Sequence, residues 1–266
     1  MKLGKRQIAE LVAVVGVVCG VFALFLVWGF GLLKYSNDGT FLAAELVLLG
    51  LAAGCLAGSL LIGKAELDLI AAVAGAGAFG LYLFEPARHA FNALGFLNAG
   101  AWLGVCTGLI PIGAGAAQLW HGRSKNKTPG VNLWTAGAAA GLVLIVVGLW
   151  SSIEKDPRFI TYWNASFSGH ALGLLLLIIA IVSAVLIAAA AISRKAELAD
   201  LALIVSTVLA GLAANEGVSD ALGSSGSMAT GAWLELVGGV VLVLALIGHR
   251  VVKLPELKLP ESKMKR

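Results

Sequence analysis

Charged side chains are scarce in this chain, and their scarcity limits what the protein can be. Asp, Glu, Lys and Arg make up only 13 % of the 266 residues, whereas hydrophobic residues make up 59 %. Soluble domains carry about 25 % charged residues. With a mean hydropathy of +0.93, this composition excludes a water-soluble globular protein and predicts a chain embedded in a lipid bilayer.

The residue types that build most catalytic and metal sites are also few. There are three cysteines, Cys19, Cys55 and Cys106, and all fall in apolar stretches without CxxC spacing. The sequence has no nucleophile–base arrangement, phosphate-binding loop or metal-ligand spacing. We therefore expect no catalytic residue, no cofactor and no metal, and a membrane enzyme acting on lipids is the weakest interpretation.

Long apolar stretches are what the chain has in abundance. Eight of them approach or exceed the roughly 20 residues that cross the hydrocarbon core as a helix. They cover residues 8–33, 41–63, 67–84, 93–120, 132–152, 170–193, 197–215 and 229–249. The third and seventh begin with charge and are the shortest. Since the backbone must satisfy its own hydrogen bonds in lipid, the prediction is an all-α polytopic membrane protein with eight transmembrane helices.

The basic residues predict the orientation in the membrane. If both termini are cytoplasmic, 15 of the 19 lysines and arginines lie on the inner side, as the positive-inside rule requires. We expect a multi-pass protein of a prokaryotic plasma membrane, with a disordered cytoplasmic tail at 251–266. The basic residues are spread over loops and the tail, so they indicate membrane orientation and not nucleic-acid binding.

The chain also repeats itself at a constant offset, which we call the repeat offset. Lys64-Ala65-Glu66-Leu67 recurs from Lys195, and Gly100-Ala101-Trp102-Leu103 recurs from Gly231 at the same separation. We interpret this as a duplication: a first four-helix repeat at 1–122, a cytoplasmic linker at 123–130 and a second four-helix repeat at 131–250. Each repeat has an even number of spans, so the two are parallel and related by an axis along the membrane normal.

A weaker, finer repeat divides each half into two helical hairpins. Gly-Leu pairs at residues 31, 80, 148 and 211 close the odd-numbered stretches. Around the third hairpin, Gly148-Leu149-Trp150-Ser151-Ser152 and Tyr162-Trp163-Asn164 resemble the SPW-repeat family of prokaryotic membrane proteins, with Trp-Ser-Ser where that family has Ser-Pro-Trp. The resemblance covers mainly residues 148–169. It implies a hairpin repeat architecture and no particular reaction.

Two runs of glycine recur every four residues, at Gly50, Gly54 and Gly58 and at Gly100, Gly104 and Gly108. This spacing places each run on one helix face, where the missing side chains allow close approach of another helix. The neighbouring helix can belong to the same chain, which is the more common case. It can also belong to a second copy or to another membrane protein.

Acidic residues in or near the spans are the other candidates, because an ionisable group in a membrane helix is costly. Glu45 and Glu235 lie about one turn inside the second and eighth stretches, and Glu85 and Glu216 end the third and seventh at equivalent positions. One interpretation is an outward-facing acidic vestibule that attracts cations or protons. The other is that these acids reach water at the helix ends and help to set the topology.

Tryptophan lies near the predicted outer boundary of several spans, at Trp102, Trp150, Trp163 and Trp233. The preference of indole for the headgroup level explains these positions. The function we favour from the sequence is a non-enzymatic structural, assembly or accessory subunit that packs in the bilayer against itself or another membrane protein. The alternative is a transporter or channel for a small solute or cation.

Overall fold

The computed structural model describes residues 4–26, 39–89, 99–120, 128–151, 167–222 and 230–252, and regular structure in these ranges is entirely helical. The predicted residues Trp163 and Tyr162, most of the linker and the tail from 253 lie outside them. The helices are α1 Lys5–Phe25, α2 Gly39–Ile62, α3 Ala65–His89, α4 Ala99–Val105, α5 Leu109–Trp120, α6 Leu133–Leu149, α7 Phe167–Ser193, α8 Ala196–Leu222 and α9 Thr230–Val251.

Seven helical segments are long and apolar enough to cross a membrane, so the chain is a multi-pass membrane protein. α4 and α5 form one of these segments, Ala99–Trp120. α6 is apolar but only 17 residues long, which corresponds to about 25 Å of helix. The predicted third and seventh stretches, which looked short, are among the seven.

Both of these stretches extend further than their hydropathy predicts. α3 and α8 begin with acidic residues in the first turn, Glu66 and Asp68 in α3 and Glu197 in α8. Acidic side chains there are favoured by the positive end of the helix dipole. Most of the extension is at the other end, where the predicted stretches stop at 84 and 215 and the helices continue to His89 and Leu222.

A helix break lies just before Pro111, whose ring disfavours a continuous α-helix. Between α4 and α5, Cys106–Gly108 form a short 3₁₀ turn. Pro111 lacks an N–H and its ring crowds the carbonyl four residues earlier, and that residue is Thr107. The Thr107 hydroxyl donates to the carbonyl of Gly104 at 2.6 Å, so the local polar groups at the break are used internally.

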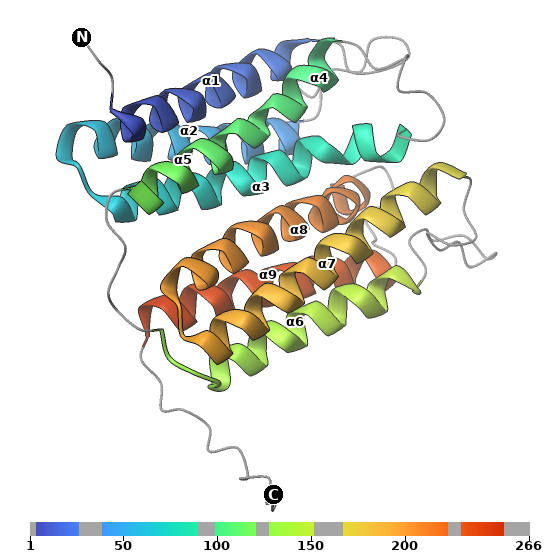
Figure 1. Ribbon diagram of the computed structural model, residues 1–266. Coiled ribbons are helices and arrows are strands. Elements are labelled where there is room, and N and C mark those ends of the chain that lie inside the picture. Colours follow the sequence, from blue (N-terminus) through green and yellow to red (C-terminus); the bar gives the residue numbers. More distant parts are fainter. Residues whose placement is uncertain are drawn as a thin grey trace, which may run out of the picture.

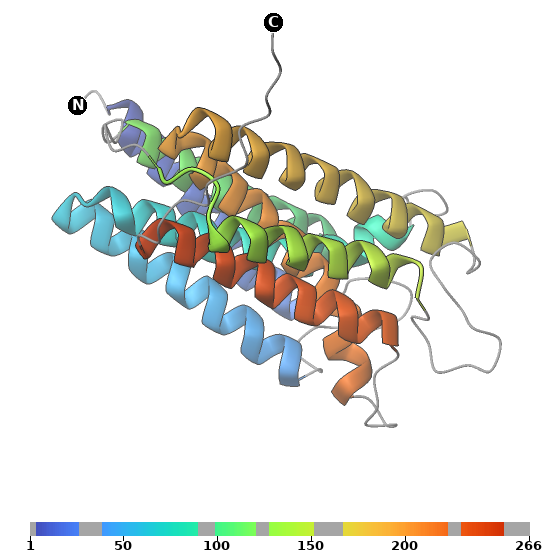
Figure 2. The ribbon, with the colours of Figure 1, turned by 90° about the horizontal axis from the view of Figure 1, so that it is seen from below.

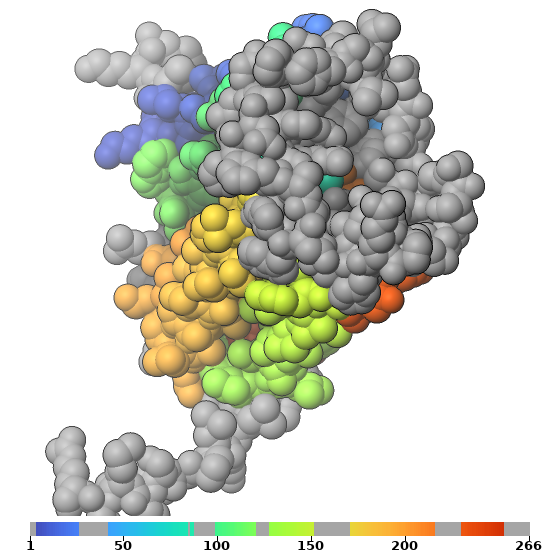
Figure 3. Space-filling view, turned by 90° about the vertical axis from the view of Figure 1, so that its right-hand side faces the viewer, coloured from blue at the N-terminus to red at the C-terminus, as the bar shows by residue number. Residues whose placement is uncertain are grey.

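The helices run roughly alongside one another and form two groups (Figures 1 and 2). In the first group α1 packs on α5, and α3 packs on both α2 and α5. In the second group α6 packs on α9, and α8 packs on both α7 and α9. α3 and α8 join the groups. Figure 3 shows the first group (blue to green) above the second (yellow to red).

Two tight hairpins, α2–α3 and α7–α8, turn at the same end of the molecule, where α1 also begins and α9 ends (left in Figure 1). We call this the hairpin end. Gly63 and Arg194 both have positive φ, 73° and 55°, and each donates its N–H to the carbonyl four residues earlier at 2.8 Å. These two residues are related by the repeat offset, so the two helix ends are closed in the same way.

Candidate functional site

Glu45 is the most unusual side chain in the described interior. It lies on α2, is 1 % exposed, and neither carboxylate oxygen has a hydrogen-bond partner among the described residues. Leu49, Ala52 and Leu56 follow it on the same buried face of α2. The sequence predicted an acid about one turn inside this span, but not that its carboxyl group would be fully buried without a described partner.

Glu235 is equally buried in the second group of helices. It lies on α9, where Gly148 of α6 leaves room for its side chain: a Cβ built on Gly148 would be 2.6 Å from Cγ of Glu235. At the repeat offset Glu45 corresponds to Leu176, and Glu235 to Gly104. Each group of helices therefore holds a buried carboxyl away from the hairpin end, supplied by a different helix in each case.

The structure does not describe the side chains of the other two predicted acids. Glu85 and Glu216 fall within α3 and α8, but their side chains lie outside the described part of the structure. An acidic vestibule built from all four glutamates therefore stays a prediction. Glu45 and Glu235 themselves belong to different helix groups.

Two charged clusters at the hairpin end were not predicted. In the first, Arg6 of α1 forms a 2.7 Å ion pair with the buried Glu10. The Arg6 guanidinium also donates to the carbonyl and hydroxyl oxygens of Ser59 on α2, at 2.8 and 3.1 Å. The four-residue spacing of Arg6 and Glu10 on one helix was the available signal. This cluster fastens α1 to the end of α2.

The second charged cluster joins the two groups of helices. Asp200 of α8 forms an ion pair with Arg250 of α9, with 3.0 Å between Nε and Oδ1, and its Oδ2 accepts a hydrogen bond from Arg250 Nη2 at 3.1 Å. Gln118 of α5 donates to the same carboxylate at 2.7 Å. Nothing in the sequence brings residues 118, 200 and 250 together, so only the fold reveals this network. Its charges are paired, which suits a structural role.

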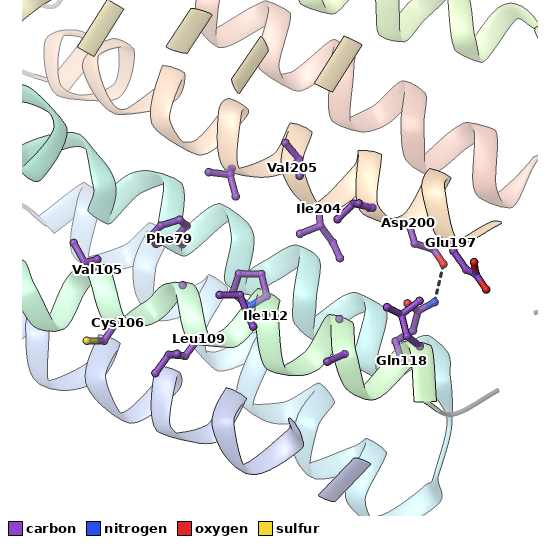
Figure 4. Close-up of a pocket in the computed structure, with 17 residues that line it drawn as sticks. Phe79, Val105, Cys106, Leu109, Ile112, Gln118, Glu197, Asp200, Ile204 and Val205 are labelled. Carbon is purple, nitrogen blue, oxygen red and sulfur yellow. Dashed lines mark hydrogen bonds between the residues drawn. The ribbon is translucent and has the colours of Figure 1, made fainter. Parts of the chain in front are cut away.

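A groove of about 740 Å³ opens between α5 and α8 (Figure 4). Its lining is apolar along most of its length, with Phe79, Ile112 and Ile204 among the lining residues, and becomes polar at the hairpin end near Gln118, Asp200 and Glu197. Ile112 is 67 % exposed, so the groove faces outward.

The two predicted glycine runs behave differently. Gly100, Gly104 and Gly108 are buried, and a Cβ on Gly108 would be 3.1 Å from the Phe79 ring. Gly50 and Gly54 are exposed, and a Cβ on either would meet no described atom within 4 Å. Packing against the described residues therefore does not explain Gly50 and Gly54, although Gly58 does approach Leu67.

The described tryptophans of the predicted interfacial set are exposed. Trp102, Trp150 and Trp233 are 46 %, 53 % and 52 % exposed. Trp102 and Trp233 lie on α4 and α9, the fourth helix of each group, counting α4 and α5 as one. None of the three lines the α5–α8 groove. Their exposure fits aromatic residues at a membrane boundary.

The described His, Cys, Asp and Glu residues form no group of three that could hold a metal ion. The three cysteines are free and half-buried. No family model, curated protein or solved structure matches the chain.

Proposed function

We propose that this protein is a non-enzymatic membrane subunit that assembles, through the outward face of α2, with a second copy or another membrane protein. Its architecture in this proposal is eight transmembrane helices in two parallel four-helix repeats, with α6 as the short eighth span. The equivalent hairpin ends at Gly63 and Arg194 and the equivalent helix pairings support the repeats. The resemblance of residues 148–169 to SPW repeats belongs to the same proposal.

The difference between α2 and α7 carries the assembly proposal. The two helices occupy equivalent positions, and both present an outward face. α7 covers that face with Ile181 and Val185, which are 54 % and 61 % exposed, as a helix facing only lipid does. α2 has Gly50 and Gly54 at the equivalent positions. Small residues four apart let another helix backbone approach closely, and this contact drives helix association in membranes.

Affinity purification from the native membrane in mild detergent, followed by native mass spectrometry, tests this assembly. We expect the wild-type chain to carry a partner at fixed stoichiometry, or a second copy of itself. The variant Gly50→Leu/Gly54→Leu loses that partner, because leucine side chains hold the helices apart. The matched control Ile181→Leu/Val185→Leu changes the equivalent face of α7 and keeps it. A lone monomer in the wild-type sample contradicts the proposal.

The alternative function is transport of a small cation or solute, and the burial of Glu45 and Glu235 is the observation that favours it. In liposomes, a transporter loses flux in Glu45→Gln and Glu235→Gln, and in the double variant Glu85→Gln/Glu216→Gln if an outer acidic vestibule feeds the path. A subunit with a structural role tolerates all of these changes and depends instead on Gly50 and Gly54.

Orientation completes the proposal. We infer cytoplasmic termini in the plasma membrane of a prokaryote, because the basic residues gather on the side that holds both termini. The exposed Lys64 and Lys195 lie in the two hairpins at that end. Cysteines introduced at these two positions in intact cells should react with a membrane-impermeant maleimide only after the membrane has been permeabilised.

A further inference from the structure

A carboxyl group without a partner inside a membrane helix bundle requires an explanation. Glu10 and Asp200 are as buried as Glu45, but each is paired with an arginine. Glu45 has no such partner among the described residues, and both of its oxygens are enclosed. A buried ionised carboxylate is strongly disfavoured unless it is paired or neutralised.

The position of Glu45 within the bundle is apolar on several sides. The cluster at its level contains Leu24 of α1, Leu49 of α2 and Ala101 of α4, all buried. Glu45 on α2 and Tyr82 on α3 lie at equal numbers of residues from the hairpin that joins the two helices. The two helices run antiparallel from one hairpin, so both side chains lie about 25 Å from it.

The described titratable side chains near this level are engaged elsewhere and do not neutralise Glu45. Tyr82 donates its hydroxyl to the carbonyl of Gly20 at 3.0 Å, and Cys19 of α1 lies against Cys106.

On the helices packed on α2, the charged side chains that the structure describes lie at the hairpin end, far from this level. They are Lys5, Arg6 and Glu10 on α1, Glu66 and Asp68 on α3, and Glu197 and Asp200 on α8. The side chains of Glu85 and Arg88 on α3 and of Glu216 and Asp220 on α8, towards the other end of these helices, lie outside the described part.

Packing alone does not call for a glutamate at this position. The equivalent residue of the second group is Leu176, which is fully buried. The fold thus accepts an aliphatic side chain of similar length at the same place. A carboxyl group at position 45 adds nothing to the apolar cluster that leucine would lack, so its use lies in its chemistry.

We propose that Glu45 is a proton-binding site in the interior of the first helix group. A bound proton makes the carboxyl neutral, as the apolar surroundings require. A sodium ion is less suitable, because metal cations need several oxygen ligands and the described side chains at this level are mostly aliphatic. This site goes beyond the assembly role and stands on different residues from Gly50 and Gly54.

Dicyclohexylcarbodiimide is a suitable probe, because it is apolar and reacts with protonated carboxyl groups in low-polarity surroundings. The carboxyl O–H adds across one C=N bond, and acyl migration then leaves a stable N-acylurea that retains the whole reagent. The full-length protein in liposomes should gain one reagent mass, mapped to Glu45 by peptide mass spectrometry. Labelling should slow as the medium is made more alkaline.

Three further samples make the result decisive. Glu45→Gln should lose the label while retaining the wild-type unfolding transition, and Glu10→Gln, which alters a paired acid, should retain it. The variant Gly50→Leu/Gly54→Leu should also label normally, which separates this site from the assembly proposal. Infrared spectroscopy should show a protonated-carboxyl C=O band in the wild type that Glu45→Gln lacks.

Two outcomes overturn the inference. If folded wild-type protein shows neither the label at Glu45 nor the infrared band, the carboxyl does not hold a proton. If sodium ions protect Glu45 from the reagent at constant pH, the site binds a metal cation instead. Wild-type measurements decide both points, so they do not depend on whether any variant folds.

Discussion

Gly80 of α3 and Gly211 of α8 face each other where the two groups of helices meet. A Cβ on Gly80 would lie 3.0 Å from Cα of Gly211 and 2.9 Å from the backbone nitrogen of Leu212. The contact is reciprocal: a Cβ on Gly80 would strike the carbonyl of Val208, and one on Gly211 that of Gly77 at 2.5 Å. Both pairs, 80 with 211 and 77 with 208, are related by the repeat offset. This is the pattern of a two-fold interface.

Gly80→Ala and Gly211→Ala should therefore weaken the fold. The added methyl group meets backbone atoms, which cannot turn aside as a side chain can. Overpacking of this kind costs about 1–3 kcal/mol, measurable as a shift in reversible unfolding by dodecyl sulfate in mixed micelles. Gly54→Ala is the control, since its Cβ meets no described atom. Equal effects at positions 80 and 54 would contradict the close crossing of α3 and α8.

The Asp200–Arg250 pair should be important for stability. Arg250→Met leaves a buried carboxylate without its main partner, and such a loss costs about 3–5 kcal/mol. Asp200→Asn/Arg250→Met should be less damaging than Arg250→Met alone, because the charge is removed together with its partner. The same unfolding assay gives the coupling energy from the double-mutant cycle. Lys195→Met, which changes an exposed charge, is the control and should have little effect.

The two hairpin turns have different residues at their left-handed position, glycine in one and arginine in the other, and these residues can be replaced. Arg194 has φ of 55° and Gly63 has φ of 73°, and a left-handed conformation costs a non-glycine residue about 1–2 kcal/mol. Arg194→Gly should raise the free energy of unfolding, and Gly63→Ala should lower it. Arg194→Ala removes the same side chain but keeps the strain, so it separates the two contributions. A stabilising Arg194→Ala would show that the arginine side chain, and not the backbone, is responsible.

Trp102 and Trp233 should report the same membrane depth. They are equivalent at the repeat offset, and both are about half exposed on the surface of the bundle. Brominated lipids with the bromine near the headgroup should quench variants that retain either tryptophan alone, and to a similar degree. Lipids brominated deep in the acyl chain should quench both weakly. Unequal depth profiles would contradict two parallel repeats, because these require equal positions along the membrane normal.

Much of the fold could be predicted because it depends on local properties of the chain. Hydropathy indicated the membrane helices, and the recurrence of the Lys64 motif at Lys195 predicted a duplication; the turns at Gly63 and Arg194 are separated by the same repeat offset. The extents of α3 and α8 were underestimated mainly at their second ends, because Glu85-Pro86 and Glu216 lower the hydropathy average there. The break beside Pro111 was predictable, since the ring acts on its own helix.

The candidate site depended on the tertiary structure for a different reason. Glu45 and Gly50 lie on the same apolar helix, and only the positions of α1 and α3 determine that the first faces inward and the second outward. The Asp200 network likewise joins three helices that are distant in sequence. The sequence by itself thus determined which segments form apolar helices, because apolar length is a property of each segment. The rotation of each helix about its axis, and hence which acids and glycines are buried, was decided by packing between segments.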